Sequence, residues 1–358
     1  MTGAPLCAHF GVCGGCAFQD MADGVYRAMK RETVLRALAQ QGFADAVVDD
    51  IVESAPETRR RATFKVAKLN GAIEIGFHAA KSHTIVDLNE CRVMTPALTA
   101  LVPGLHAMMG ALLHDGEKTE LHVTETDTGF DLVLHWKRLE TTKLTAEIAR
   151  WAERLNLARV TGNGEPLVEL RAPVVRFGKA RVKLPPDAFL QPTKDGEAIL
   201  QAQVLAGIGR AKTVADLFAG CGTFALPLAE QARVQAIEQD GTMLTALAAA
   251  AKATQGLKPL AIEKRDLFKR PLAGPELAKF DAVVLDPPRA GASAQAKALA
   301  GSTTGRVVYV SCNAVSFARD ARVLVDGGYR MGVIVPVDQF LWSSHIELVT
   351  TFERGKKR

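Results

Sequence analysis

Residues 216–224 read Asp-Leu-Phe-Ala-Gly-Cys-Gly-Thr-Phe, a glycine-containing turn that directly follows a short apolar run. Glycines at a strand-to-helix turn allow the backbone to approach a ligand closely, and the N-terminus of the next helix favours polar or negative groups. The turn lacks the G-x-G-x-x-G spacing of dinucleotide-binding enzymes, so by itself it predicts only a nucleotide-like ligand. The residues expected to contact that ligand are Phe218, Gly220, Gly222 and Thr223.

Strands and helices alternate regularly throughout the part of the chain that contains this turn. Helical patterns at residues 242–253 and 314–326 separate several short apolar runs. The alternation predicts an α/β domain with a Rossmann-like, mostly parallel sheet and helices on both faces. The seven expected strands are Val214–Phe218, Val234–Ile237, Leu260–Glu263, Ala282–Leu285, Val307–Val310, Met331–Val335 and Ile346–Thr351.

The chain before this α/β region has a different pattern. Residues 50–190 alternate with a period of two, with hairpin signals at 70–71 and 127–129 and one helical pattern at 142–155. We therefore predict three regions: a cysteine-rich loop and helix at 1–48, a β-rich (α+β) central domain at 49–188, and the α/β domain at 189–358.

Two acidic residues follow the second and third expected strands. Glu238 lies twenty residues past Phe218, where a carboxylate can accept hydrogen bonds from both hydroxyls of a ribose. Asp266 follows the third strand, where an adenine amine would lie. In this order, the glycine turn, Glu238 and Asp266 resemble a class I methyltransferase that uses S-adenosylmethionine as cofactor. The alternative is an α/β protein with an ordinary glycine turn.

The fourth and fifth expected strands end in residues with reactive side chains. Asp286 begins an Asp-Pro-Pro-Arg sequence, and Cys312 follows the fifth strand. An amine needs no thiol in order to be methylated, whereas carbon 5 of a pyrimidine does: addition of a thiolate to carbon 6 makes carbon 5 nucleophilic. A base must then remove the proton from carbon 5, and Glu347 at the start of the last strand is the candidate. The alternatives are an inert buried thiol and a structural ion pair.

Four sequence stretches together resemble the RNA uracil-C5 methyltransferase family: Phe189-Leu190-Gln191, Asp286-Pro287-Pro288-Arg289, Tyr309-Val310-Ser311-Cys312-Asn313 and His345-x-Glu347. The resemblance implies that Gln191 helps to hold the cofactor and the target base, and that Asp286 lies between them. It also implies a covalent bond between Cys312 and carbon 6 of uridine. The chain departs from the family at Thr193 and Thr223, where asparagine is common, and a hydroxyl cannot replace a bidentate amide.

Four of the six cysteines lie outside the α/β region: Cys7, Cys13 and Cys16 stand close together, and Cys91 stands alone. Four thiolates suit an iron–sulfur cluster or a zinc ion, and three close ligands with one remote ligand are more typical of a cluster. Family members with Cys-Gly-Gly-Cys near the start carry a [4Fe–4S] cluster, so the resemblance implies one here. We expect its role to be structural.

Composition limits where in the cell the protein is expected and which partners it is expected to bind. No apolar run approaches the ~18 residues of a membrane span, and the first residues show no secretory signal. A cytoplasmic protein with no membrane contact and no obligate protein partner is expected. The net charge of +5 is too small to identify a nucleic-acid partner. The basic cluster Arg59–Arg61, followed by Lys65 and Lys68, is the candidate for phosphate contacts.

The cysteine-rich stretch at residues 10–16, Phe-Gly-Val-Cys-Gly-Gly-Cys, bears on the substrate. It most resembles the methyltransferases of 23S ribosomal RNA, so we expect ribosomal RNA as the partner. Because Cys7 is nearly the first residue, no additional N-terminal RNA-binding domain is expected. Three alternatives remain: a transfer RNA uridine-C5 methyltransferase, an RNA cytosine-C5 methyltransferase, and a non-catalytic iron–sulfur RNA-binding protein.

Overall fold

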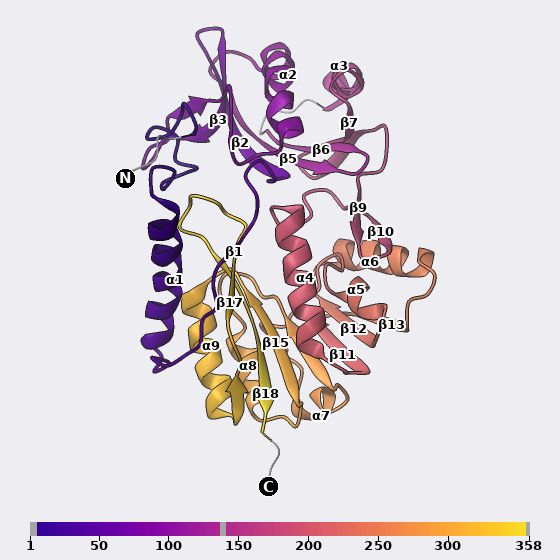
Figure 1. Ribbon diagram of the computed structural model, residues 1–358. Helices are drawn as coiled ribbons and strands as arrows, with labels where there is room; N and C mark the ends of the chain where they lie inside the picture. Colours follow the sequence, from indigo (N-terminus) through magenta and orange to yellow (C-terminus); the bar gives the residue numbers. More distant parts are fainter. Residues whose placement is uncertain (1–5, 137–140, 356–358) are drawn as a thin grey trace.

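Two large β-sheets organise the chain in the computed structural model, which describes residues 6–136 and 141–355 (Figure 1). One sheet forms the centre of the α/β region and the other the centre of the β-rich region. None of the described helices is long and apolar enough to cross a membrane.

The α/β sheet has nine strands in the order β1-β17-β18-β15-β14-β11-β12-β13, with β16 paired to β18. The five strands from β15 to β13 are parallel to their neighbours, while β18 runs antiparallel to β15, β16 and β17. The strands are β1 (Val52–Glu53), β11 (Thr213–Leu217), β12 (Arg233–Glu238), β13 (Leu260–Lys264), β14 (Ala282–Leu285), β15 (Arg306–Ser311), β16 (Tyr329–Met331), β17 (Val335–Asp338) and β18 (Glu347–Arg354). The predicted, mostly parallel α/β sheet is confirmed.

The expected number of seven strands is wrong for two reasons. The single strand predicted at 331–335 is divided into β16 and β17, because the chain turns at Gly332 and Ile334 then pairs with Val48. A side chain at Gly332 would meet the carbonyl oxygen of Thr351 at 2.9 Å, so glycine is required where the backbone passes β18 so closely. The second addition is β1, which comes from outside the predicted α/β region.

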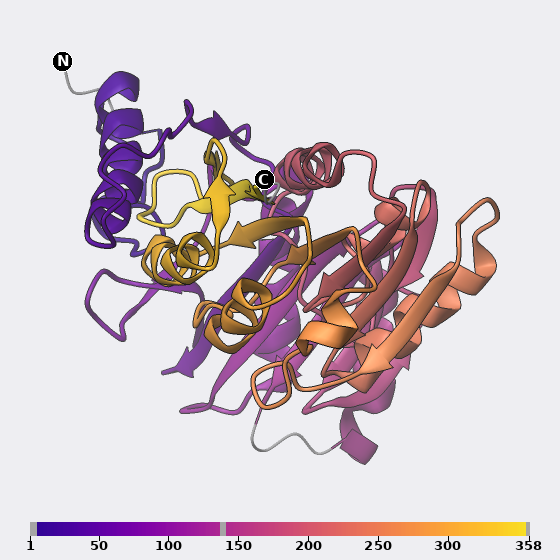
Figure 2. The same cartoon turned by 90° about the horizontal axis from the view of Figure 1, so that it is seen from below.

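Helices cover both faces of this sheet (Figure 2). Neighbouring strand residues point to opposite faces: Val214 packs in the core beneath α4 to α6, and Ala215 packs in the core beneath α1, α8 and α9. The helices are α1 (Asp23–Ala39), α4 (Lys194–Ile208), α5 (Ala225–Ala229), α6 (Gly241–Ala253), α7 (Gly274–Leu277), α8 (Ser293–Ala300) and α9 (Ala314–Asp326).

The β-rich region forms a seven-stranded sheet in the order β4-β3-β2-β5-β6-β7-β8. Both predicted hairpins are present, as β2–β3 and β5–β6. Two helices pack against the sheet, α2 (Pro96–Leu112) and α3 (Thr141–Arg154), whereas only the second was predicted. The strands are β2 (Arg61–Leu69), β3 (Ala72–His78), β4 (Ile85–Asp87), β5 (Lys118–Thr126), β6 (Gly129–His135), β7 (Leu157–Gly162) and β8 (Glu165–Glu169).

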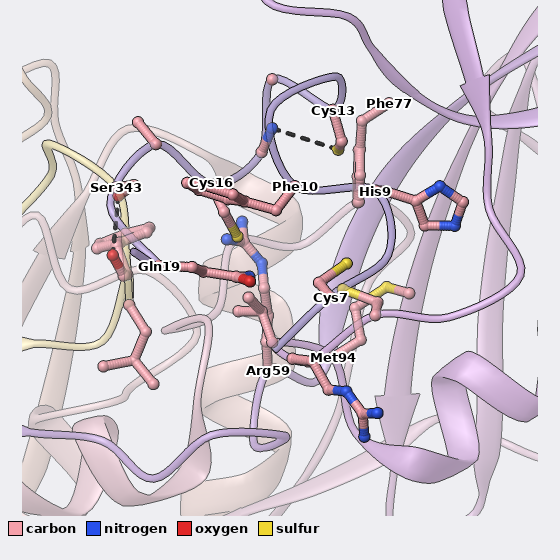
Figure 3. A pocket seen from close by; sticks show the side chains of 18 of the residues that line it. Cys7, His9, Phe10, Cys13, Cys16, Gln19, Arg59, Phe77, Met94 and Ser343 are labelled. Carbon is pink, nitrogen blue, oxygen red and sulfur yellow. Dashed lines mark hydrogen bonds between the residues drawn. The ribbon is translucent and has the colours of Figure 1, made fainter. Parts of the chain in front are cut away.

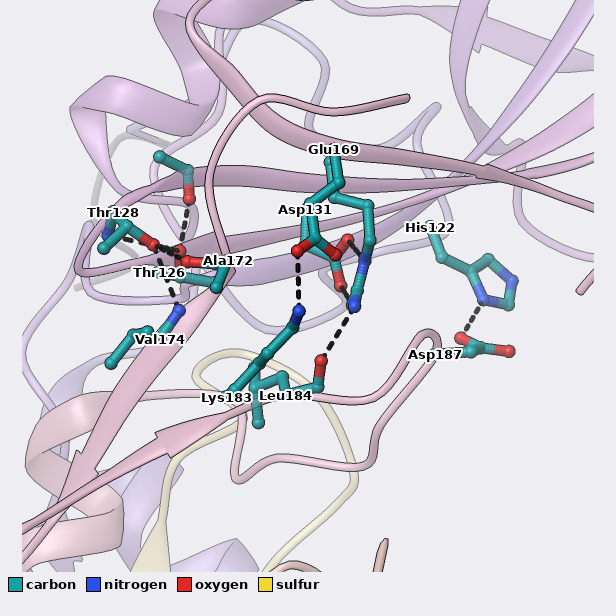
Figure 4. Close-up of polar contacts among 12 residues, drawn as sticks. His122, Thr126, Thr128, Asp131, Glu169, Ala172, Val174, Lys183, Leu184 and Asp187 are labelled. Atoms are coloured by element: carbon teal, nitrogen blue, oxygen red, sulfur yellow. Dashed lines mark hydrogen bonds and ion pairs between the residues drawn. The ribbon is translucent and has the colours of Figure 1, made fainter. Parts of the chain in front are cut away.

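A small hairpin connects the two regions. Its strands, β9 (Val174–Phe177) and β10 (Ala180–Lys183), pack their apolar side chains into the core of the α/β sheet. Arg159 in β7 forms a buried ion pair with Asp131 in β6 and donates to the carbonyl oxygen of Leu184, just after the hairpin (Figure 4). We propose that residues 174–188 belong with the α/β domain.

Candidate active site and cysteine cavity

The carboxyl ends of the parallel strands meet the start of β18 at one cavity of about 500 Å³. This is the edge at which open α/β sheets bind their ligands. Most of the residues predicted for cofactor binding and catalysis line this cavity: Gln191, Phe218, Gly220, Glu238, Asp286, Cys312 and Glu347.

The glycine turn and the predicted ribose carboxylate are in direct contact. The amide of Gly220 donates to Oε2 of Glu238 at 3.0 Å. Gly220 has a φ of 54° and Gly222 a φ of 103°, both in the left-handed region that favours glycine. A Cβ on Gly222 would lie 2.5 Å from the side chain of Leu247, so this second glycine allows helix α6 to pack closely.

Three predicted cofactor contacts lie outside the cavity lining: Gly222, Thr223 and Asp266. The carboxylate of Asp266 accepts hydrogen bonds from the amides of Phe268 and Lys269, which stabilises the turn after β13. The carbonyl oxygen of Thr223 accepts from the side chain of Gln201. Cofactor contact by these three residues stays a prediction.

Thr193, the other position that departs from the family pattern, has a structural role. Its hydroxyl accepts from the amide of Gly196 at 3.1 Å as the N-cap of α4, and it also bonds to the hydroxyl of Ser54. Threonine is a good N-cap, so the substitution preserves the start of the helix.

Several lining residues were not predicted from the sequence. Met243, Leu267 and Phe268 contribute apolar surface beside the glycine turn. The ring centroids of Phe218 and Phe268 lie 5.5 Å apart, so the two rings form an apolar wall suited to a planar base. Single apolar residues after a strand carry no distinctive sequence signal, which explains why they were missed.

Strand register places the candidate nucleophile and base together. Ser311 in β15 pairs with Leu348 in β18, so Cys312 and Glu347 stand next to each other at the same end of the two strands. Asp286 follows β14, the neighbour of β15 on the other side. Glu347 is 3% exposed, and Cys312 is half-buried.

Burial and the negative charge of neighbouring groups disfavour the charged forms of the acidic groups in the cavity. Burial, with the negative charges of Glu347 and Asp286, raises the pKa of Cys312 to about 11, although Arg289 acts in the opposite direction. Burial and the charge of Asp286 raise the pKa of Glu347 to about 8. The residue Asp286 is partly exposed towards the cavity. Burial of its carboxyl group nevertheless raises its pKa to about 7. A positive charge in the cavity would relieve this repulsion.

Gln339 is a further residue of the site that the sequence did not reveal. It is 1% exposed and follows β17, beside Glu347 in the neighbouring strand. Its Nε2 donates to Oε1 of Gln191 at 2.6 Å, and its hydrogen bond with Glu347 lowers the pKa of that carboxyl. Gln339 therefore connects the predicted base with Gln191.

The four outlying cysteines line a second cavity, of about 460 Å³ (Figure 3 labels Cys7, Cys13 and Cys16). Backbone hydrogen bonds fix the loop that carries Cys7, Cys13 and Cys16, among them those from Gly14 to His78 and from Ala17 to Trp342. A Cβ on Gly14 would lie 2.8 Å from the carbonyl oxygen of His78. The first glycine of the Cys-Gly-Gly-Cys motif is therefore needed for this close approach.

Buried thiols and an arginine share this second cavity. Burial raises the pKa of Cys16 to about 12, and burial likewise raises the pKa values of Cys13 and Cys91. Arg59 also lines the cavity; burial lowers its pKa, while Cys91 and Cys16 act in the opposite direction. Soft sulfur donors beside a cation suit an anionic metal–thiolate group.

The basic cluster predicted to contact phosphates is largely engaged within the protein. Arg60 is 2% exposed and forms a buried ion pair with Glu197 at 2.6 Å. Arg61 donates to the carbonyl oxygen of Leu190, and Lys68 donates to two carbonyl oxygens at the end of α2. The prediction is wrong for Arg60, because the charge needed for a phosphate is buried against a carboxylate.

The tRNA (uracil-5-)-methyltransferase family model matches residues 175–354. The chain belongs to this family. An uncharacterised RNA methyltransferase of Brucella suis is 44% identical over 354 residues, covering 99% of this chain and 85% of the relative. The 23S rRNA (uracil(1939)-C(5))-methyltransferase RlmD of Halomonas elongata is 33% identical, covering 98% of this chain and 76% of the relative.

A solved structure has a similar fold. It is the tRNA (uracil-54, C5)-methyltransferase of Pyrococcus abyssi in complex with S-adenosyl-L-homocysteine, with a TM-score of 0.76 and 21% identity over 95% of this chain and 84% of that one. The class I methyltransferase fold is thus confirmed. The protein is an RNA methyltransferase of the uracil-5 family.

Proposed function

We propose that the protein methylates carbon 5 of a uridine in 23S ribosomal RNA. The observation that carries the chemistry is the placement of Cys312 and Glu347 at adjacent strand ends in the cavity that also holds the glycine turn. A thiol alone would fit several reactions, and the buried carboxyl beside it supplies the base that carbon-5 methylation requires.

In the proposed mechanism, Cys312 loses its proton to solvent, the thiolate forms a bond to carbon 6 of the uracil, and the electron pair of the 5,6 double bond moves towards carbon 5 and the carbonyl oxygen. S-adenosylmethionine supplies the methyl group that carbon 5 then accepts. Glu347 removes the proton from carbon 5, the double bond re-forms, and the Cys312–carbon 6 bond breaks to release the thiolate. Gln339 holds the carboxyl of Glu347 in position, and Gln191 holds the uracil.

Ribosomal RNA is favoured over transfer RNA by two observations. The cysteine-rich stretch at residues 10–16 resembles the ribosomal RNA enzymes. The relative named as a 23S rRNA methyltransferase is 33% identical across nearly the whole chain, whereas the transfer RNA enzyme of known structure is 21% identical. The uracil must leave its stack in the RNA to reach Cys312, because Cys312 lies inside a cavity of the protein.

We further propose that Cys7, Cys13, Cys16 and Cys91 would hold a [4Fe–4S] cluster. All four line one cavity, and Arg59 there would offset part of the negative charge of the thiolates. Among the described residues, their sulfurs do not form a group within 4.8 Å of one another. Three ligands close together in the sequence with one remote ligand are more typical of a cluster than of a single zinc ion. The cluster would fix the N-terminal loop to the central domain.

The test uses RNA labelled with tritium at carbon 5 of uridine, with ribosomal and transfer RNA in parallel. Wild type is expected to release tritium from ribosomal RNA. Cys312→Ala should abolish release and keep S-adenosylmethionine binding, and Glu347→Gln should accumulate a covalent RNA complex. Release from transfer RNA alone would refute the substrate assignment. Activity of Cys312→Ala would refute the mechanism.

A further inference from the structure

A separate group of metal-ligating side chains lies on the central sheet, outside both cavities. His122 in β5 and His135 in β6 converge with Asp187, which lies in the segment between β10 and α4 (Figure 4 shows His122 and Asp187). Their ligand atoms all lie within 4.8 Å of one another, and no other such group of three His, Cys, Asp or Glu occurs in residues 6–136 and 141–355. We propose that these three residues bind a divalent transition-metal ion, with zinc as the best match.

The two histidines are held in place by strand register. His135 pairs with Glu120, and His122 is two residues further along the strand that contains Glu120. Side chains two residues apart lie on the same face of a strand, so both imidazoles project from one face of the sheet. Leu121 and Val123 project from the other face into the core beneath α2. Rigid strands therefore fix two of the three ligands before any ion binds.

The distances match a single ion. Nδ1 of His122 lies 2.7 Å from Oδ1 of Asp187, and Nε2 of His135 lies 3.6 Å from Oδ2 of the same carboxylate. A tetrahedral ion with bonds of about 2.1 Å holds its ligand atoms about 3.4 Å apart, a value between these two distances. The imidazole centroids are 4.4 Å apart with the rings inclined at 54°, so both rings can turn one nitrogen towards a common point.

Charge and access also fit this proposal. Arg61 faces Asp187, but its guanidinium lies over the Phe189 ring and donates to a backbone oxygen. The nearby Glu120 forms an ion pair with Lys65. The site thus combines two imidazoles with one carboxylate that, without an ion, is hydrogen-bonded to His122, and a bound ion would take the place of this contact, with the fourth position left to water. The side chains are 27–43% exposed, so an ion can enter from solvent. Imidazole with carboxylate selects zinc, nickel or copper over magnesium or calcium.

An ion bound here would attach the segment before Gln191 to the central sheet. Asp187 is two residues from Phe189 and four from Gln191, and both of these residues line the active-site cavity. The site would therefore join the central domain to the mouth of the active site. This consequence concerns the position of the segment and does not depend on which RNA is the substrate.

The experiment is a zinc titration of the full chain, purified without air, against a chromophoric chelator. Wild type is expected to bind one zinc equivalent more than His135→Ala or Asp187→Asn. Affinity for that equivalent should fall by more than ~100-fold, since loss of even an outer partner of a ligand costs 10–100-fold. The matched control is His83→Ala: His83 and His78 also form a close ring pair, 5.4 Å between centroids, but lack a converging carboxylate.

The cysteines are identical in all four proteins, so any zinc they take cancels in the comparison. Cobalt in place of zinc should add visible d–d bands without thiolate charge-transfer bands in wild type and in His83→Ala, and these bands should be absent from His135→Ala and Asp187→Asn. Equal zinc binding by wild type and both site variants would overturn the proposal. Loss of the same equivalent in His83→Ala would also overturn it, as would a cobalt spectrum with thiolate bands alone.

Discussion

Replacing Glu347 by glutamine is expected to stabilise the unliganded protein at alkaline pH, even though the same change removes the proposed base. Glu347 is 3% exposed, and its pKa is about 8 in the folded protein against an ordinary value of 4.5. A raised pKa means that the folded state binds the proton more tightly. The stabilisation is fully present below the unfolded pKa and is lost as pH rises through about 8.

The magnitude follows from the two pKa values. The tighter proton binding of the folded state corresponds to about 4.8 kcal/mol at 1.36 kcal/mol for each tenfold change. Between pH 5 and pH 8, the free energy of unfolding of wild type should therefore fall by about 3.5 kcal/mol relative to Glu347→Gln. Glutamine has the shape of the protonated acid and carries no charge, so it removes the pH-dependent contribution without creating a cavity.

The assay is urea denaturation of both proteins without methyl donor at pH 5 and pH 8, followed by circular dichroism. Glu165→Gln provides the control, because Glu165 is an exposed carboxylate in β8. Its stability difference from wild type should not change with pH by more than about 0.5 kcal/mol. If the difference between wild type and Glu347→Gln is the same at both pH values, the carboxyl is not held protonated and the reasoning is wrong.

Three further outcomes are expected. Binding of the cationic S-adenosylmethionine near pH 7.5 should release more protons than binding of the neutral S-adenosylhomocysteine, measured by calorimetry in buffers of different ionisation enthalpy; equal release would contradict the electrostatic account. Gln339→Leu should lower kcat about 10–100-fold through loss of its buried hydrogen bonds to Gln191 and to Glu347, with the Kd for S-adenosylmethionine little changed in equilibrium dialysis. Arg60→Leu should destabilise the protein by about 3–5 kcal/mol in urea unfolding, because it leaves Glu197 unpaired, and a double variant that also carries Glu197→Leu should recover most of that loss.

The predicted site residues lie together because parallel strands order them along one edge. Glu238, Asp286 and Cys312 each end or follow a strand whose apolar run is evident in the sequence. Once these strands are adjacent, their carboxyl ends and the residues there must meet. The site could therefore be predicted without knowledge of the exact strand order.

The parts that could not be predicted depend on contacts between distant residues. Gln339 bonds to Gln191 across 148 positions, and a buried amide has no sequence pattern of its own. Helix α2 is apolar on most sides and contains Pro103, so it lacks the alternation of faces that identifies a surface helix. The sequence does not distinguish Arg60 from an exposed basic residue, because its buried partner Glu197 lies 137 positions away.

The raised pKa values give the proposed reaction an order. With a pKa of about 11, Cys312 is a neutral thiol in the unliganded protein, and only the thiolate attacks carbon 6. A positive charge in the cavity lowers the pKa of the thiol, so the nucleophile forms when the donor is bound. Once that positive charge is no longer present, the charge of Asp286 would again raise the pKa of Glu347. Glu347 then becomes a stronger base at the step at which the proton must leave carbon 5. The burial that destabilises the charged groups of the unliganded site thus favours thiolate formation first and removal of the carbon-5 proton second.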